Sequence, residues 1–367
     1  MKKMLFTIAC ATAALSLSAS PARAQSVPPT VYVVVDAELN SVRAGRAAGG
    51  HSTSRVEDGT GLGLAGSRLG FRGTEDLGDG LTAGFVLEGG FLADTGTLAQ
   101  GGRAFGRQTY VSLAHTSFGE LRMGRQYLLG DLVSAIGEPF GGAMVTKTST
   151  AISGVGFTSL PVWLDAARGD NIVQYATPVL GGFYAAVQAA PGEGTNDAFY
   201  ALMGNYRGGS FTAAISHEWN KDRGTGAKTN RSWTFGGSYA PGPYKAGASF
   251  QHASNLSSTS GNGEAAGFNF TLPATSSDPT FKATRFDGAL ASVEVPSGLF
   301  TFGAEWLQGR YRDSAGHSVT LKRPGLGATY ALSKRTSLYA GFSTVVGDLK
   351  GYTNQRRIMN AGIRSFF

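Results

Sequence analysis

Hydrophobic and polar residues alternate along most of this chain, in segments of roughly ten residues that begin near Val31. Near the carboxyl end, for example, Leu338 and Phe342 fall on one face of an extended segment, and Tyr339 and Ser343 fall on the other. A ten-residue strand is roughly 34 Å long, and at a tilt of about 40° it spans roughly 26 Å, close to the apolar band of an outer-membrane barrel. The pattern recurs about sixteen times. The sequence therefore predicts an all-β fold, a transmembrane antiparallel β-barrel of about sixteen strands.

The connections between these segments alternate between short and long. Turns rich in glycine and proline, such as 178–182 and 241–243, alternate with long loops, such as 128–170 and 253–284. This alternation is typical of barrels with short periplasmic turns and longer extracellular loops. Because the pattern continues without a break, we predict one barrel domain over residues 25–367, located in the outer membrane.

The first residues are typical of a targeting segment. Lys2 and Lys3 precede an apolar run over residues 4–19, and Ala22-Arg23-Ala24 is a small-x-small cleavage site. These features predict a signal peptide over residues 1–24 that is cleaved before Gln25. An uncleaved anchor is the alternative, although the apolar run is short and ends in small residues.

Composition narrows the possible functions. The chain has 54 glycines in 367 residues, about twice the usual share of roughly 7%, and its 16% of charged residues is below the usual quarter. Loss of the leader lowers the basic count from 32 to 29, against 25 acidic residues, an excess too small and scattered to predict nucleic-acid binding. The five histidines lack the spacing of metal sites, and no Ser/His/Asp grouping is evident. We therefore predict no metal, no cofactor and no enzymatic activity.

Charged residues fall on the inner face of the predicted barrel. In the segment 67–72, the alternation that turns Leu69 and Phe71 outward turns Arg68 and Arg72 inward. The same count places three acids inward, while the orientation of Arg107 is ambiguous; the acids are Asp36, Glu38 and Glu88. Buried charges are costly unless they are solvated or paired, so charges of both signs indicate a water-filled pore.

The loop from Leu128 to Asp170 is too long for a plain connection. It could cap the barrel from outside, or fold inside and narrow it. Glu138 lies in a turn with glycines that allow close approach to a wall, whereas Asp131 could either line the pore or brace the loop. Acids on such a loop, opposite arginines on the wall, would create a constriction with a transverse field, since charged rings set the selectivity of pores.

Several motifs resemble those of a known family. They are Ser-Arg-Leu-Gly-Phe-Arg-Gly-Thr-Glu-Asp-Leu-Gly (67–78), Phe-Gly-Arg-Gln-Thr-Tyr-Val-Ser-Leu (105–113), Met-Gly-Arg-Gln-Tyr (123–127), Asp-Asn-Ile-Val-Gln-Tyr-Ala-Thr-Pro (170–178) and the final Ala-Gly-Ile-Arg-Ser-Phe-Phe. They are similar to the general porins of Gram-negative outer membranes, of the β-proteobacterial type. The resemblance implies a sixteen-stranded homotrimeric barrel whose third long loop folds into the pore, and a passive channel for small hydrophilic solutes and inorganic ions.

The resemblance also implies roles for single residues. Arg68, Arg107 and Arg168 match the basic side of the pore constriction, Glu138 an acidic loop position, and Glu88 an acid of the wall. Two positions depart from the family pattern. Val33 stands where the family usually has glycine, and Ser134 stands near a second loop acid of some relatives. A missing loop acid favours a weak to moderate preference for anions.

Two further residues are expected to act in assembly. Arg125 shares the parity of Leu121 and Met123, so it is expected to face outward near a subunit contact. Phe367 is expected to be an assembly signal for the barrel-assembly machinery, and the exterior is expected to contact outer-membrane lipid. Three alternatives to a general channel stay open at this point: a solute-specific anion channel, an outer-membrane barrel enzyme and an adhesin.

Overall fold

The computed structural model describes residues 28–142, 151–154, 157–161, 164, 167–194, 196–256 and 283–367. The expected signal peptide, residues 1–24, lies outside these described residues, as do parts of the loops 128–170 and 253–284. Within the described residues, no helix is both long enough and apolar enough to cross a membrane.

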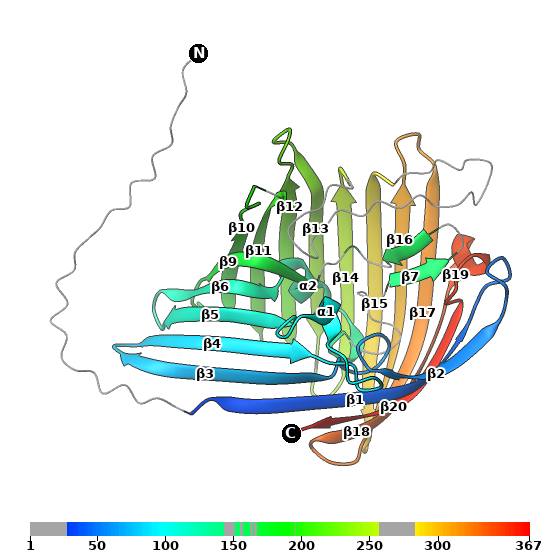
Figure 1. The fold of residues 1–367 in the computed structure, drawn as a ribbon, viewed down its shortest axis with the longest axis horizontal. Coiled ribbons are helices and arrows are strands. Elements are labelled where there is room, and N and C mark those ends of the chain that lie inside the picture. The colour runs from blue at the N-terminus through cyan, green and yellow to red at the C-terminus, as the bar shows by residue number, and fades with distance from the viewer. Residues whose placement is uncertain are drawn as a thin grey trace.

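The described chain forms a closed antiparallel barrel (Figure 1). The strands of its main sheet are β1 (Thr30–Arg43), β2 (Ser52–Asp58), β3 (Arg68–Gly78), β4 (Leu81–Gly90), β5 (Gln108–His115), β6 (Gly119–Tyr127), β9 (Arg168–Ala176), β10 (Phe183–Ala190), β11 (Ala198–Gly208), β12 (Phe211–Lys221), β13 (Lys228–Tyr239), β14 (Lys245–Ser254), β15 (Arg285–Ser297), β16 (Phe300–Arg312), β17 (Ser318–Ala331), β18 (Thr336–Thr344), β19 (Val346–Gly347) and β20 (Arg357–Phe366). The remaining elements are α1 (Ala99–Gly102), α2 (Leu129–Ser134), η1 (Pro139–Gly141), β7 (Ala151–Gly154), β8 (Phe157–Pro161) and η3 (Asp348–Gly351).

The barrel has the predicted number of strands. Segments β2 and β3 follow one another along β1, and β18 and β19 follow one another along β17, so the eighteen segments of the sheet make sixteen barrel strands. Pairing of β1 with β20 closes the ring. Phe367 extends that seam, since its backbone N–H donates to the Val33 carbonyl at 2.9 Å and its carbonyl accepts from the Val33 N–H at 3.1 Å. This closure pairs the first strand of the barrel with the last, as a membrane barrel requires.

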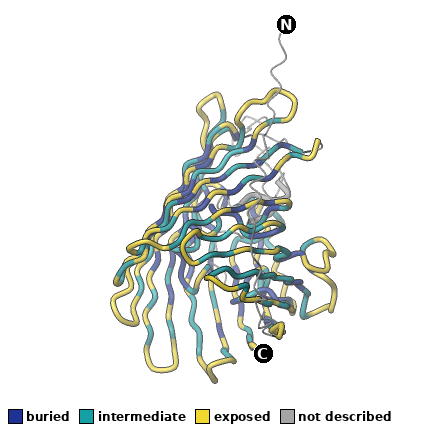
Figure 2. The backbone as a smooth tube through the Cα atoms, turned by 90° about the vertical axis from the view of Figure 1, so that its left-hand side faces the viewer, coloured by how far each residue is buried: buried dark blue, intermediate teal, exposed yellow. Residues whose placement is uncertain are grey.

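The outer face is apolar, as the alternation predicts. Burial alternates along the strands in Figure 2, with exposed residues gathered at the turns. On β16, Phe302 and Trp306 are exposed on the outside, whereas Glu305 between them is buried. Lysine or arginine on the lipid face would cost about 2–4 kcal/mol at the midplane of the membrane. This cost strongly determines which of the alternating residues of a strand face the lipid.

One stretch of the predicted strand pattern is wrong. The sequence predicts a loop over 45–61 and a strand over 63–72, but β2 pairs with β1 and residues 59–67 leave the ladder before β3 begins. Two buried carboxylates replace the lost ladder bonds. Asp36 accepts from the Ala65 N–H at 2.7 Å, and Asp58 accepts from the Ser67 N–H at 3.2 Å. This segment, residues 59–67, is called the inner segment below.

The long loop folds inside the barrel, which decides between the two alternatives that the sequence left open. Helix α2 lies within the ring of strands and packs against β11, β12 and β13 (Figure 1). Gly236 leaves no room for a Cβ against the Val133 carbonyl, and Gly303 leaves none against the Phe140 ring. Such close approach requires glycine on the wall.

The inner face is less polar than the alternation predicts. Leu129 and Val133 of the loop are fully buried against inward residues of β10–β12, such as Phe199 and Met203. Each such side chain stabilises the packing by about 1.5–3 kcal/mol. A second apolar cluster, including Phe286, fills the lumen beside the outer ends of β14–β17. The inner face is therefore polar where it lines the open lumen, and apolar where the loop or another apolar cluster packs against it.

Candidate functional site

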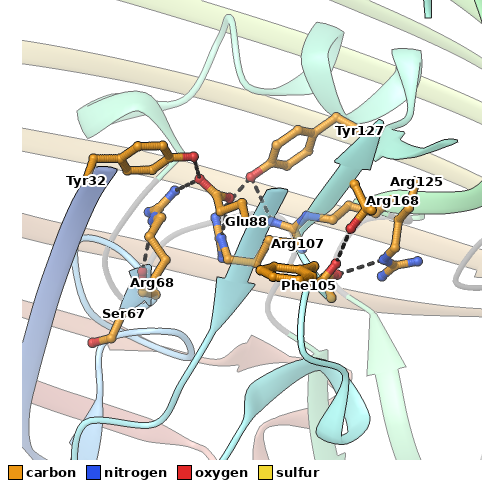
Figure 3. Close-up of polar contacts among 12 residues, drawn as sticks. Tyr32, Ser67, Arg68, Glu88, Phe105, Arg107, Arg125, Tyr127 and Arg168 are labelled. Atoms are coloured by element: carbon orange, nitrogen blue, oxygen red, sulfur yellow. Dashed lines mark hydrogen bonds and ion pairs between the residues drawn. The ribbon is translucent and has the colours of Figure 1, made fainter. Parts of the chain in front are cut away.

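Three arginines gather on one inner wall of the barrel. Arg68 begins β3, Arg107 precedes β5, and Arg168 begins β9, and all three line one cavity of about 750 Å³. Figure 3 shows them around Glu88, with Tyr32 and Tyr127 beside them. We call this group of inward side chains the arginine wall; its members are Tyr32, Arg68, Glu88, Arg107, Tyr127 and Arg168. The predicted basic residues are thus brought together.

A single carboxylate holds the centre of the arginine wall. Glu88 accepts from Arg107 Nε at 2.7 Å and from the Tyr32 hydroxyl at 2.8 Å, and it lies 3.9 Å from Arg68 Nη1. Glu88 and Arg107 are both buried. A buried ion pair tolerates loss of water only when its geometry is good and further hydrogen bonds are made, as they are at Glu88. The three guanidinium groups nevertheless outnumber this one carboxylate.

Tyr127 links the other two arginines, and sequence reasoning missed it. Its hydroxyl accepts from Arg107 Nη2 at 3.0 Å and from Arg168 Nη2 at 2.7 Å. The Arg168 guanidinium also lies 4.4 Å from the centroid of the Tyr127 ring, which is a cation–π distance. Tyr127 closes the Met-Gly-Arg-Gln-Tyr motif, but nothing in one sequence indicates which groups its hydroxyl meets.

The loop acids face the same cavity. Asp131 and Ser134 of α2, and Glu138 just before η1, line it together with the arginine wall. Ser134 itself is buried, with its hydroxyl donating to the Asp131 carbonyl at 3.0 Å. The cavity therefore has guanidinium groups on one side and loop carboxylates on the other.

Polar residues of the opposite wall anchor this loop. Glu218 accepts from the Gly130 N–H at 2.7 Å, and Glu294 accepts from the Phe140 N–H at 2.6 Å. Lys245 donates to the Glu138 carbonyl at 2.6 Å. We call the inner faces of β10–β16, with the loop that they hold, the loop-covered wall. Their inward parity is readable from the sequence, but their partners on the loop are not.

Asp36 and Glu38 point inward but do not line the open pore, so this prediction is wrong. Their exposed fractions are 0% and 2%. Asp36 accepts from the Tyr339 hydroxyl at 2.6 Å as well as from the inner segment, and Glu38 accepts from Asn360 Nδ2 at 2.5 Å. The inner segment covers both carboxylates, because leaving the ladder placed it inside the barrel.

Arg72 lies on the same wall but in a different cavity. Its guanidinium is 5.5 Å from the centroid of the Tyr32 ring, and it lines a cavity of about 250 Å³ with Tyr110 and Glu120. Arg72 is therefore adjacent to the arginine wall, without facing Asp131 and Glu138.

Arg125 does not need a neighbouring subunit to cover it, and its expected place near a subunit contact stays a prediction. Arg125 pairs with Thr109 on the outer face, yet it is only 7% exposed within the single chain. Its Nη1 lies 2.6 Å from Asp170, and its Nε donates to the Gly106 carbonyl at 2.7 Å. The pairing of β6 with β9 shifts in register between Gly124 and Gln126, and this irregularity lets Asp170 reach Arg125. Counting alternate residues along the sequence cannot reveal such a shift.

Known proteins match this chain in sequence and in fold. The model of the Gram-negative porin family matches residues 11–348. An outer membrane porin protein of Bordetella pertussis is 32% identical over 307 residues, covering 75% of each chain. Outer membrane porin protein 32 of Delftia acidovorans is 30% identical over 362 residues, covering 94% of this chain and 89% of the relative.

Among solved structures, the anion-selective porin from Comamonas acidovorans aligns with a TM-score of 0.69 and 25% identity, covering 94% of this chain and 100% of that one. These relatives are channels rather than enzymes. The barrel, the inward loop and the sequence matches lead to one conclusion: the chain belongs to the Gram-negative porin family and is a diffusion channel of the outer membrane.

Proposed function

We propose that this porin passes small hydrophilic solutes with a weak to moderate preference for anions, and that the arginine wall sets this preference. The observation that carries the proposal is the grouping of three guanidinium groups around one carboxylate, Glu88, on a cavity-facing wall. Screening at physiological salt acts over about 8 Å, so these local charges matter more than the net charge of the chain. The anion selectivity named for the Comamonas acidovorans porin supports the proposal.

Two other acids that line the cavity, Glu57 and Asp58, are held by neighbouring groups. Glu57 is paired with Arg55 and accepts from Asn40, and Asp58 accepts from Thr60 and Ser67. Asp131 and Glu138 stand on the loop side of the cavity. A permeating anion would therefore pass along the arginine wall, and a cation along the loop, in a transverse field.

The reversal potential in a potassium chloride gradient tests this proposal. We expect the wild type to favour chloride, and Arg68→Glu with Arg168→Glu to shift the potential toward potassium. Arg168 is a better target than Arg107, which is buried against Glu88. The control is Lys334→Glu with Arg335→Glu, which makes the same charge change in the exposed turn before β18. A cation-selective wild type, or equal shifts in both double variants, would show that the arginine wall does not select.

The proposal also covers export and assembly, which we expect to resemble those of other Gram-negative porins. We infer that residues 1–24 are removed on export, that the mature chain forms a homotrimer with lipid around it, and that the assembly machinery recognises Phe367. The Phe367 side chain is 71% exposed while its backbone completes the seam with β1, so it is accessible to a partner. Replacing Phe367 by Asp should reduce heat-resistant barrel in outer-membrane fractions. Normal levels of folded barrel would rule out this role.

A further inference from the structure

A second group of cations lies on the outside of the barrel. Besides Lys228, which lies 4.8 Å from the centroid of the Trp219 ring, the outward positions at the extracellular ends of β13–β17 carry five permanent positive charges; these strands are neighbours in Figure 1. The five charges are those of Arg231, Arg285, Arg310, Arg312 and Lys322. Among the described outward positions of these five strands, Asp287 is the one carboxylate. We call this group the outer basic patch.

One pair of like charges faces each other across the strands of the outer basic patch, beside a single carboxylate. The register places Arg285 opposite Arg312, and Asp287 opposite Arg310. The Asp287 carboxylate is 2.6 Å from Arg312 Nη2 and also contacts His252, so this one negative charge is divided between Arg312 and His252 and does not balance all the arginines around it. Like charges directly opposite one another destabilise a sheet, so an anion held between these arginines would offset a repulsion built into the fold.

An apolar groove begins directly below this patch, on the same outer face. It has a volume of about 490 Å³, with Ala291, Ala304 and Pro324 at its floor and Trp306 and Leu326 at its rim. On β17, Lys322, Pro324 and Leu326 are successive outward positions, so patch and groove are continuous. On β16, Arg310 lies four residues from Trp306, a distance of about 13 Å along a strand.

We propose that the outer basic patch and the groove together bind one phosphorylated lipid of the outer leaflet. The phosphate lies among Arg285, Arg310 and Arg312, since one guanidinium group can donate two parallel hydrogen bonds to two oxygens of a phosphate. An acyl chain lies in the groove between Trp306 and Leu326. Trp306 fits this placement, because tryptophan is enriched where headgroups meet hydrocarbon. The proposal rests on the outer-membrane location of the chain and is independent of ion selectivity.

The first test measures which lipid binds. Purified protein in mild detergent is titrated with diphosphorylated lipid A, with the same lipid lacking phosphates, and with inorganic phosphate alone, and adducts are counted by native mass spectrometry. We expect one retained lipid per chain for the phosphorylated form, and binding at least about tenfold weaker without phosphates, since each nearby basic residue strengthens binding to anionic lipid several-fold. Equal binding of both lipids, or retention of inorganic phosphate in place of the lipid, would overturn the proposal.

The second test locates the site. Arg285→Gln with Arg310→Gln and Lys322→Gln should weaken binding of diphosphorylated lipid A at least about tenfold. The matched control is Arg207→Gln with Lys334→Gln and Arg335→Gln, which removes three charges at the other end of the barrel. This control should leave lipid binding unchanged. Equal binding by the two triple variants would contradict the site.

The groove is tested by a substitution that leaves the charge unchanged. Ala304→Trp fills the groove and should release the lipid while keeping single-channel conductance and reversal potential at wild-type values. These pore measurements also show that the variant is folded. If Ala304→Trp separates subunits and leaves lipid binding intact, this face is a contact between copies of the chain, and the lipid proposal is wrong.

Discussion

The arginine wall and the loop-covered wall face each other across one lumen, but they are built in different ways. The arginine wall is held by charge, with Arg107 and Tyr32 bonded to Glu88 and with Arg107 and Arg168 bonded to Tyr127. The loop-covered wall is held by apolar packing around Leu129 and Val133 and by carboxylates that accept backbone N–H groups of the loop. The lumen of this barrel thus combines one wall held by charged groups with one wall that holds the long loop in place.

This contrast predicts different consequences of losing one carboxylate on each wall. The largest effect should follow Glu88→Leu, which leaves Arg107 buried without a charged partner. Breaking a buried pair from one side costs about 3–5 kcal/mol. We expect a marked fall in the temperature at which the folded band is lost on gels.

Glu120→Leu is the control for this variant. It removes a carboxylate from a more exposed pair, Glu120 with Arg122 at 2.7 Å, and exposed pairs contribute about 1 kcal/mol or less. Equal loss of thermal stability in the two variants would contradict a special role of Glu88.

On the loop-covered wall, Glu218→Gln with Glu294→Gln should change the pore more than the stability of the barrel. Hydrogen bonds to charged groups contribute about 1.5–3 kcal/mol each, and both of these hold loop backbone. We expect more frequent partial closures and noisier open currents in single-channel recordings. The control is Glu193→Gln. The exposed Glu193 carboxylate, in the loop after β10, accepts from Asn171 of β9 and touches no residue of the long loop's α2 or η1, so this variant should leave the recordings unchanged. Quiet, wild-type currents in the double variant would mean that apolar packing alone holds the loop.

The smallest effect should follow Tyr127→Phe. The ring stays under Arg168, but the hydroxyl that accepts from both Arg107 and Arg168 is lost. We expect a small decrease in anion preference with conductance near the wild-type value, because one neutral acceptor contributes about 1 kcal/mol. Tyr175→Phe removes a hydroxyl bonded to the Phe118 carbonyl on the outer side, and should leave selectivity unchanged. An unaltered reversal potential in Tyr127→Phe would show that the Tyr127 hydroxyl is not needed to position Arg107 and Arg168.

Much of the fold could be predicted from the sequence because a strand has a period of two and a membrane barrel has a fixed height. The sixteen strands, the apolar exterior and the inward direction of Arg68 and Glu88 all follow from that period. The prediction failed where the ladder is interrupted. The inner segment, the cover over Asp36 and the burial of Arg125 each depend on a departure from regular pairing.

The sequence by itself therefore determined the barrel, its orientation of faces and the residue types of the pore. Tertiary structure alone decided that the long loop lies inside, that Tyr127 joins two arginines, and that Asp36 and Glu38 are enclosed. The physical reason is range. Alternation is a local property of neighbouring residues, whereas the contact of Glu218 with Gly130, or of Asp36 with Tyr339, joins positions far apart in the chain that meet only when the barrel closes.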